Sequence, residues 1–313
     1  MSQGNKNKPS NSFIIKNIAI THGFSYCGFA EAAYLDSESG FLDKWLKSSY
    51  HSGLSYMERN KAKRIDPRLL FEGARSLIVL AMNYYPGETF QQNTRYRVAR
   101  YALGDDYHSV LKVRSEKLIS ELQEKHAGFS YRSFIDSAPL MEKAWAARAG
   151  LGKIGKNGLL IIPGAGSYFS LCIIITDMLL EYDEPFTRDL CGTCHKCMNA
   201  CPVSAIAQPG VVDSSKCISA LTIEHKQNQC DISNVKLHNR IFGCDICQEV
   251  CPWNEYSESA AETGFTPYPF FKEATDEQWE NMTEEEFNSL FSKSPLKRMA
   301  YKGIMRNIRL NKK

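Results

Sequence analysis

The pattern of apolar and polar positions along the first 180 residues predicts a domain that mixes helices and strands. Apolar residues recur at helical spacing over Phe13–His22 and Tyr107–His126, and Leu140–Ala149 is an alanine-rich helix. Ser76–Met82 is a continuous apolar run, typical of a strand that is covered on both faces. The fold class is therefore expected to be α+β. Shorter strands are expected at Tyr26–Ala30, Phe129–Ile135, Leu159–Ile162 and Tyr168–Asp177, the last two as a hairpin around Pro163–Gly166.

The rest of the chain predicts two further regions. Glu181–Arg188 is acidic and rich in turn-forming residues, so we expect a linker that leads into a cysteine-rich stretch. Thr283 and Glu286 form a capping box that opens a helix toward Phe291. The expected organisation is a disordered N-terminus at 1–11, a catalytic domain at 12–180, a cysteine-rich module at 181–262 and a helical C-terminal segment at 263–313.

Eight of the eleven cysteines fall into two clustered runs, which predict two iron–sulfur clusters. A tetranuclear cluster needs four thiolates around one cube. Three of them come from a tight loop, and in paired arrangements the fourth comes from the other run. The spacing therefore predicts crossed ligation, in which Cys251 completes the first cluster and Cys201 serves the second. The first set is Cys191, Cys194, Cys197 and Cys251, and the second set is Cys201, Cys217, Cys244 and Cys247.

Zinc and disulfides are the alternatives to iron–sulfur clusters. Zinc sites favour two separated pairs of ligands, often with histidine, whereas here four cysteines lie within about eleven residues and the arrangement then nearly repeats. Disulfides are rare where thiols stay reduced, and no signal peptide is recognised. Cys27 and Cys172 lie in apolar, strand-like contexts and are expected in the core, whereas Cys230 is expected in a polar loop.

Length and charge narrow the function classes. About 180 of the 313 residues precede the two clustered cysteine runs, which is more than electron storage requires, so we expect an enzyme with its own electron relays. The longest apolar stretch, Leu171–Leu180, is shorter than the ~20 residues of a membrane span, so a soluble, cytoplasmic protein without a membrane partner is expected. The formal net charge of +3 is offset by about two negative charges on each cluster, so nucleic-acid binding would need a local basic surface.

Four segments of the chain resemble signatures of the epoxyqueuosine reductase family. They are Arg100–His108, Ile135–Asn157, Cys217–Glu224 and Phe242–Asn254, and the resemblance extends from Phe13 to Asn307. It implies a nitroreductase-like α/β sandwich that binds cobalamin, followed by a bacterial ferredoxin-like module with two [4Fe-4S] clusters and a short helical C-terminus. It also implies the reaction, in which the epoxide oxygen of epoxyqueuosine is removed at the wobble position of tRNAs with a GUN anticodon to give queuosine.

The resemblance also bears on the length of the chain and on its partners. Several family members continue into a helical-repeat domain that helps to grip tRNA, whereas this chain ends at Lys313. Ser294–Asn307 still matches, so we expect a complete core enzyme in a short form. An external electron donor such as flavodoxin or ferredoxin is implied, and a monomer is expected. Two other classes stay open: a cobalamin-dependent, reductive dehalogenase-like reductase of a small molecule, and a non-catalytic ferredoxin-type electron carrier.

The resemblance assigns Asp136 as the proton donor. An acid at the end of an apolar strand and beside a cofactor is expected to have a raised pKa through desolvation, as a donor at neutral pH requires. A turn or cap aspartate before the helix at Leu140 is the alternative. His108 is not expected to ligate cobalt, because the glycine expected three residues later is Leu111, and ordinary hydrogen bonds at a helix start are expected instead. The resemblance places cobalamin contacts at Tyr56, Arg100, Tyr101, His108, Asn157, Ser167, Ser219 and Asp245.

Two basic segments are candidates for tRNA contact, with a solvated basic surface as the alternative for each. Arg95 and Arg97 are interleaved with aromatic residues, a composition that suits phosphates and unstacked bases. Four basic residues near the C-terminus recur every three or four positions, so a single helix would align them as one stripe against the tRNA backbone. They are Arg298, Lys302, Arg306 and Arg309.

Overall fold

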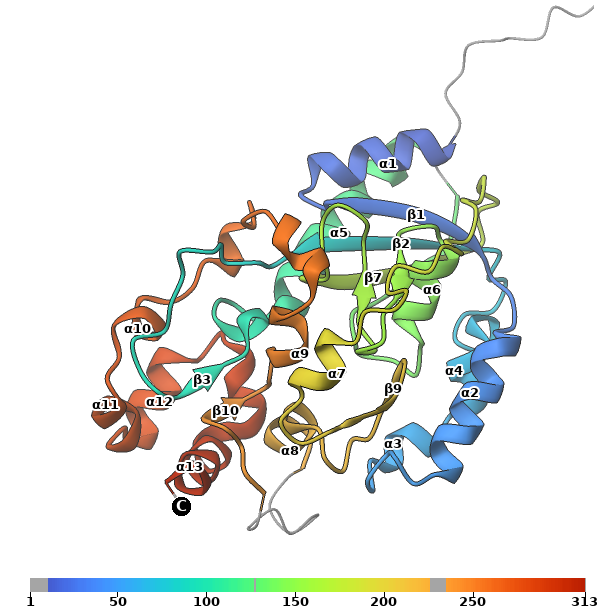
Figure 1. Cartoon of the computed structure of the whole chain (residues 1–313). Helices are drawn as coiled ribbons and strands as arrows, with labels where there is room; N and C mark the ends of the chain where they lie inside the picture. The colour runs from blue at the N-terminus through green and yellow to red at the C-terminus, as the bar shows by residue number, and fades with distance from the viewer. Residues whose placement is uncertain (1–10, 127, 226–234, 313) are drawn as a thin grey trace, which may run out of the picture.

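The computed structural model describes residues 11–126, 128–225 and 235–312. Its largest sheet has four antiparallel strands in the order β1-β2-β7-β4 (Figure 1). β2 and β7 pair along their full lengths, from Ser76 opposite Thr176 to Asn83 opposite Phe169. The four strands are β1 (Tyr26–Glu31), β2 (Ser76–Asn83), β4 (Tyr131–Phe134) and β7 (Phe169–Thr176).

Helices cover both faces of this sheet, which makes a three-layer sandwich and confirms the predicted α+β class. Because side chains alternate along a strand, Leu77 and Val79 of β2 enter one core whereas Ile78 and Leu80 enter the other. The first core is centred on Trp145, which is fully buried. It is covered by α2 (Asp36–Lys47), α3 (Ser55–Glu58), α4 (Lys61–Ile65) and α6 (Glu142–Arg148), and the second core by α1 (Asn11–Thr21) and α5 (Tyr107–Lys125).

The hairpin predicted around residues 163–166 is wrong. β6 (Leu160–Ile161) pairs with β5 (Lys153–Ile154), and the turn itself contributes only one bridge, between Ile162 and Gly166. β7 is buried on both faces from Ser170 to Thr176, so it takes a central place in the sheet between β2 and β4. The short separation of β6 and β7 in the sequence therefore predicted the wrong partner for β7.

Gly152 lies where β5 and β6 approach each other closely. A methyl group on its Cα would lie 2.1 Å from the carbonyl oxygen of Ile161. Gly152→Ala is therefore expected to push β5 and β6 apart and to lower the free energy of unfolding by about 1 to 3 kcal/mol. Gly40→Ala in α2 is the matched control, because no atom lies within 4 Å of the added methyl group and alanine favours a helix. Urea denaturation measures both, and unchanged stability of Gly152→Ala would contradict the close packing.

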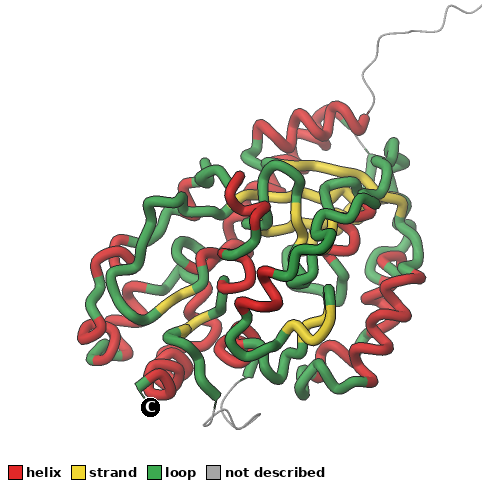
Figure 2. Tube along the Cα trace, in the orientation of Figure 1, coloured by secondary structure: helices red, strands yellow, loops and turns green. Residues whose placement is uncertain are grey.

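Loops dominate the cysteine-rich region, with only short elements between them (Figure 2). Metal–thiolate bonds can hold such loops without regular structure. Cys230, predicted in a polar loop, is not among the described residues. Before this region, burial raises the thiol pKa of Cys172 to about 12, as expected of a core residue. The elements are α7 (Lys196–Ala200), β8 (Ile206–Gln208), β9 (Val211–Val212), α8 (Ile218–Ile223), β10 (Arg240–Phe242), α9 (Ile246–Glu249) and the 3-10 helix η3 (Pro252–Tyr256).

The C-terminal helices form a third core, which they share with β3 (Arg97–Val98) and β10. Aromatic rings fill it, and Trp279 stacks on Phe291 with ring centroids 5.8 Å apart. The predicted capping box of Thr283 and Glu286 is confirmed at the start of α12. Within the described ranges, no helix is both long and apolar enough to cross a bilayer. The helices are α10 (Pro269–Glu273), α11 (Asp276–Glu280), α12 (Glu284–Leu290) and α13 (Ala300–Asn311), with 3-10 helices η1 (Pro67–Leu69), η2 (Arg100–Ala102), η4 (Thr263–Phe265) and η5 (Pro295–Met299).

Candidate active site

The eight clustered cysteines line two separate cavities, four to each. A cavity of about 350 Å³ has Cys251 on its wall together with the three cysteines of the first run, whereas Cys201 lies at the other cavity, of about 340 Å³. Cys251 therefore lies beside the first run and away from its own sequence neighbours. The first cavity is lined by Cys191, Cys194, Cys197 and Cys251, and the second by Cys201, Cys217, Cys244 and Cys247.

Burial shapes the chemistry of these thiols. It raises the pKa of Cys244 to about 11, so iron must supply the positive charge that stabilises the thiolate at neutral pH. Backbone groups already point at two of the sulfur atoms: Lys156 N donates to Cys191 Sγ at 3.4 Å, and Ala205 N donates to Cys201 Sγ at 3.2 Å. Hydrogen bonds of this kind stabilise the negative charge of a cluster and tune its reduction potential.

Asp136 lies directly after β4, at a third cavity of about 620 Å³. Its backbone is left-handed, with φ of 49°, and it lines this cavity. The residue is exposed, so the desolvation expected from its place at the end of an apolar strand is wrong. Tyr107 Oη, from α5, donates to Asp136 Oδ2 at 2.7 Å. The N-cap of α6 is Met141 and no side chain caps that helix, so the cap alternative is wrong, whereas the left-handed φ is one that a turn aspartate adopts. A non-glycine residue in a strained conformation is typical of a functional loop.

Glu142 and Lys143, at the start of α6, line the same cavity as Asp136. Burial and then the charge of Asp136 raise the pKa of Glu142 to about 8, so this carboxyl is protonated at neutral pH. Burial lowers the pKa of Lys143, whose Nζ donates to the carbonyl oxygen of Gly158 at 2.8 Å. The sequence analysis overlooked both residues. The signal available in the sequence was a pair of charged residues directly before three apolar residues, which the structure buries.

The cavity at Asp136 adjoins the cavity of the second cysteine set. Lys143, Gly158 and Val212 line both of them. A ligand held there would contact the candidate proton donor on one side and a cluster on the other. The arrangement can therefore deliver electrons and protons to one substrate, which is what a reductase requires.

Comparisons with known proteins match this architecture. Residues 64–137 match the family model described as "Epoxyqueuosine reductase QueG, DUF1730", and residues 190–254 match "4Fe-4S double cluster binding domain". The chain is 45% identical to the epoxyqueuosine reductase of Cyclobacterium marinum, over 94% of each chain. It is 44% identical to that of Cellulophaga algicola, over 96% of this chain and 98% of the relative. The chain belongs to the epoxyqueuosine reductase family.

Solved structures of epoxyqueuosine reductases share the fold. One, in complex with an epoxyqueuosine-modified tRNA-Tyr stem loop, has a TM-score of 0.84 at 31% identity, covering 96% of this chain and 80% of the other. The enzyme from Bacillus subtilis, with its catalytic aspartate loop swung out of the active site, has a TM-score of 0.86 at the same identity and coverage. The double-cluster match identifies the cysteine module as a holder of two [4Fe-4S] clusters rather than zinc or disulfides.

The structure brings together half of the residues at which the epoxyqueuosine reductase resemblance places cobalamin contacts. Asp245 is among them, and burial raises its pKa to about 6 while its Oδ2 accepts a hydrogen bond from the backbone N of Arg100 at 2.6 Å. Tyr56 lies within electrostatic reach of Asp136, whose charge helps to raise the phenol pKa after burial and Glu224. The four that line the cavity of the second cysteine set are Tyr101, Asn157, Ser219 and Asp245.

The other three residues are engaged elsewhere. Arg100 lies over the ring of Tyr85, with 5.5 Å between the guanidinium carbon and the ring centroid. His108 Nδ1 lies 2.7 Å from Asp106 Oδ1, so it makes the ordinary hydrogen bond expected at the start of a helix. Ser167 is buried and bonds with Asn254. None of these three lines the cavity at Asp136 or that of the second cysteine set.

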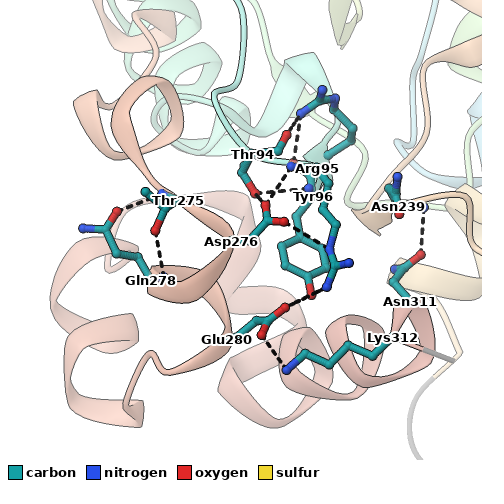
Figure 3. Close-up of polar contacts among 11 residues, drawn as sticks. Thr94, Arg95, Tyr96, Asn239, Thr275, Asp276, Gln278, Glu280, Asn311 and Lys312 are labelled. Carbon is teal, nitrogen blue, oxygen red and sulfur yellow. Dashed lines mark hydrogen bonds and ion pairs between the residues drawn. The ribbon is translucent and has the colours of Figure 1, made fainter.

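Arg95 and Arg97 are engaged within the protein. Arg95 forms ion pairs with Asp276 at 3.2 Å and with Glu280 at 2.8 Å, and Figure 3 shows it between these carboxylates and the ring of Tyr96. Arg97 donates to the carbonyl oxygens of two neighbouring loop residues. The Arg95 contacts tie the segment before β3 to α11, and the Arg97 contacts hold the loop before β3.

The expected single stripe of four basic residues is wrong. The backbone turns at Ala300, where φ is 51°, so α13 begins after Arg298, which instead pairs with Glu224 at 2.8 Å. Arg306 donates to the carbonyl oxygens of His225 at 2.5 Å and Leu221 at 3.1 Å. The two that the structure leaves exposed on α13 are Lys302 and Arg309.

Proposed function

We propose that this chain reduces epoxyqueuosine to queuosine in tRNA. The observation that carries the proposal is the continuity between the cavity at Asp136 and the cavity lined by the second set of cysteines. Electrons can leave a cluster on one wall while protons arrive from a carboxyl on the other. A non-catalytic electron carrier would need neither this cavity nor the strained loop that holds Asp136.

The chemistry sets what the site must deliver. Converting the epoxide to the cyclopentene breaks two C–O bonds, forms a carbon–carbon double bond and releases the oxygen as water. The change consumes two electrons and two protons. Clusters pass electrons singly, so an external donor such as flavodoxin or ferredoxin would load them one at a time. We assign the first cluster to Cys191, Cys194, Cys197 and Cys251, and the second to Cys201, Cys217, Cys244 and Cys247.

The residues around the joined cavities suit cobalamin. Arg64 is buried at the wall beside Asp136, and its Nε has no hydrogen-bond partner among the described residues, so an amide-bearing ligand could satisfy it. Trp45 and Met141 supply apolar wall to the same cavity. Cobalamin held there would gather single electrons at cobalt and act on carbon. We propose that Arg64, Lys143, Tyr101, Asn157 and Ser219 hold it.

The residues of this chain then have separable tasks. Asp136 supplies a proton to the epoxide oxygen, and Tyr107 fixes the orientation of its carboxyl through the 2.7 Å hydrogen bond. We propose that the enzyme acts in the cytoplasm, which suits a tRNA substrate, and as a monomer.

Lys302 and Arg309 are the basic residues of α13 that we propose to contact the tRNA backbone. Reversing both charges, with Lys302→Glu and Arg309→Glu, is expected to weaken tRNA binding and to flatten its salt dependence by a slope of about 0.7 to 0.9 per lost contact. Lys112→Glu and Lys117→Glu on α5 form the control, because these lysines are exposed on a helix of the second core, whereas α13 belongs to the third core. Filter binding across a salt series measures the slope of the binding constant against salt concentration. An unchanged slope would contradict the tRNA contact and indicate that Lys302 and Arg309 are only solvated.

Reconstitution tests the proposed function. The protein would be loaded with iron, sulfide and cobalamin, reduced, and mixed with tRNA from cells that lack epoxyqueuosine reductase. Nucleoside analysis should show epoxyqueuosine replaced by queuosine, and omission of cobalamin should abolish the conversion. Conversion that proceeds equally well without cobalamin would contradict its role, and no conversion with all cofactors loaded would contradict the function.

A further inference from the structure

Glu142 is a second carboxyl group at the reaction cavity. It opens α6, six residues after Asp136, and its Oε1 accepts a hydrogen bond from the backbone N of Asp136 at 2.7 Å. Asp136 is itself held by Tyr107 from the opposite helix layer. The end of β4 and the start of α6 therefore present two carboxyl groups to one space.

Titratable and charged groups face Glu142 from each element around the cavity. The nearest charges act in opposite directions, because Asp136 raises the pKa of Glu142 and Lys143 lowers it, while burial has the largest effect. The pKa of about 8 applies while Asp136 is charged, so Glu142 still holds a proton at neutral pH after Asp136 has given up its own. The groups are Glu38 on α2, Arg64 on α4, Tyr107 on α5, Asp136 after β4, Lys143 on α6 and Cys172 on β7, and Tyr56 on α3 and Arg298 on η5 act on the neighbouring Asp136.

The reaction needs two protons, and one carboxyl group supplies only one of them per turnover. We propose that Glu142 supplies the second proton, the one that converts the opened epoxide oxygen into water. This inference rests on the proposed function. Asp136 gives the first proton to the oxygen as one C–O bond breaks. Glu142 gives the second as the other C–O bond breaks and the carbon–carbon double bond forms, with both electrons drawn from the external donor through the clusters. Both acids become carboxylates and are reprotonated from solvent between turnovers.

Glu142→Gln separates this role from a purely structural one. The glutamine amide oxygen can still accept from the backbone N of Asp136, so the loop should keep its conformation, but the amide has no proton to give. Single-turnover conversion is expected to fall by about 10²-fold. Glu116→Gln is the matched control, because Glu116 is exposed on α5 and pairs only weakly with Lys112 at 3.9 Å. It should convert epoxyqueuosine at the parent rate.

The pH profile gives a second readout. Because Glu142 must be protonated to act, the single-turnover rate of the parent should fall as pH rises through about 8. Glu142→Gln should lack this basic limb. A structural role would leave the limb in place, since the group that titrates would then be another one.

Infrared spectroscopy of the cofactor-free protein tests the protonated state without any activity. A carboxylic acid band should be present at pH 7, disappear as the pH rises through about 8, and be absent from Glu142→Gln. The inference is overturned if that band is unchanged in Glu142→Gln, or if the variant converts epoxyqueuosine at the parent rate with the same pH profile. Failure of the parent protein itself to convert epoxyqueuosine would count against the proposed function instead.

Discussion

Asp136→Asn is expected to lose most turnover while both clusters, cobalamin and tRNA affinity are retained. Amide and carboxyl groups are nearly isosteric, and Tyr107 can still donate to the remaining carbonyl oxygen, so the position of the side chain should survive. Only the carboxyl can release a proton, and general acid catalysis typically contributes about 10² to 10⁴-fold. The single-turnover rate should fall by that order. Near-normal conversion by Asp136→Asn would remove Asp136 from the mechanism.

The matched control for this substitution is Asp177→Asn. Asp177 follows β7 at the other end of the sheet, where its carboxylate accepts from the backbone N of Ser130 at 2.9 Å, and an asparagine oxygen can replace it. Its conversion rate should equal that of the parent. Equal losses in the two variants would point to a general effect on the fold rather than to proton transfer.

Cys251→Ala is expected to remove the first cluster, spare the second and abolish turnover. Its thiol lines the cavity of the first run, although its sequence neighbours Cys244 and Cys247 line the other cavity. Iron content should fall from about eight to about four atoms per chain. Conversion should stop, because the electron path from the external donor would be broken.

Cys201→Ala is the mirror variant and should lose the second cluster instead. Cys172→Ala is the control, since Cys172 is a buried residue of β7 and should keep both clusters. Mössbauer spectroscopy distinguishes the outcomes. Loss of the cluster at Cys244 and Cys247 in Cys251→Ala would contradict the crossed assignment.

Periodicity was sufficient for the four strands of the sheet and for α1, α5 and α6. It did not predict α2, α3 and α4, which cover one face, and it did not predict every strand pairing. The buried run of β2 could be recognised because a strand covered on both faces is apolar at every position. The partners of β7 could not, because the sequence of a strand with two apolar faces does not indicate which strands will flank it, and the short turn before β7 suggested the wrong neighbour.

The candidate site, too, could be predicted from the sequence only in part. The spacing of the cysteines indicated which thiols share a cavity, because in paired runs of this spacing the fourth cysteine ligates the other cluster. Glu142 went unnoticed because its raised pKa arises from burial and from Asp136, and neither is visible until the chain is folded. The basic stripe failed because the turn at Ala300 interrupts what the spacing presented as one continuous helix.

Nucleoside analysis of tRNA from cells tests the central claim most directly. A strain without its own epoxyqueuosine reductase would express either this chain or Asp136→Asn at equal levels, and its tRNA would be digested and analysed by mass spectrometry. The account predicts queuosine with this chain and persistent epoxyqueuosine with Asp136→Asn. Persistent epoxyqueuosine with the parent chain, although both clusters and cobalamin are loaded, would contradict it.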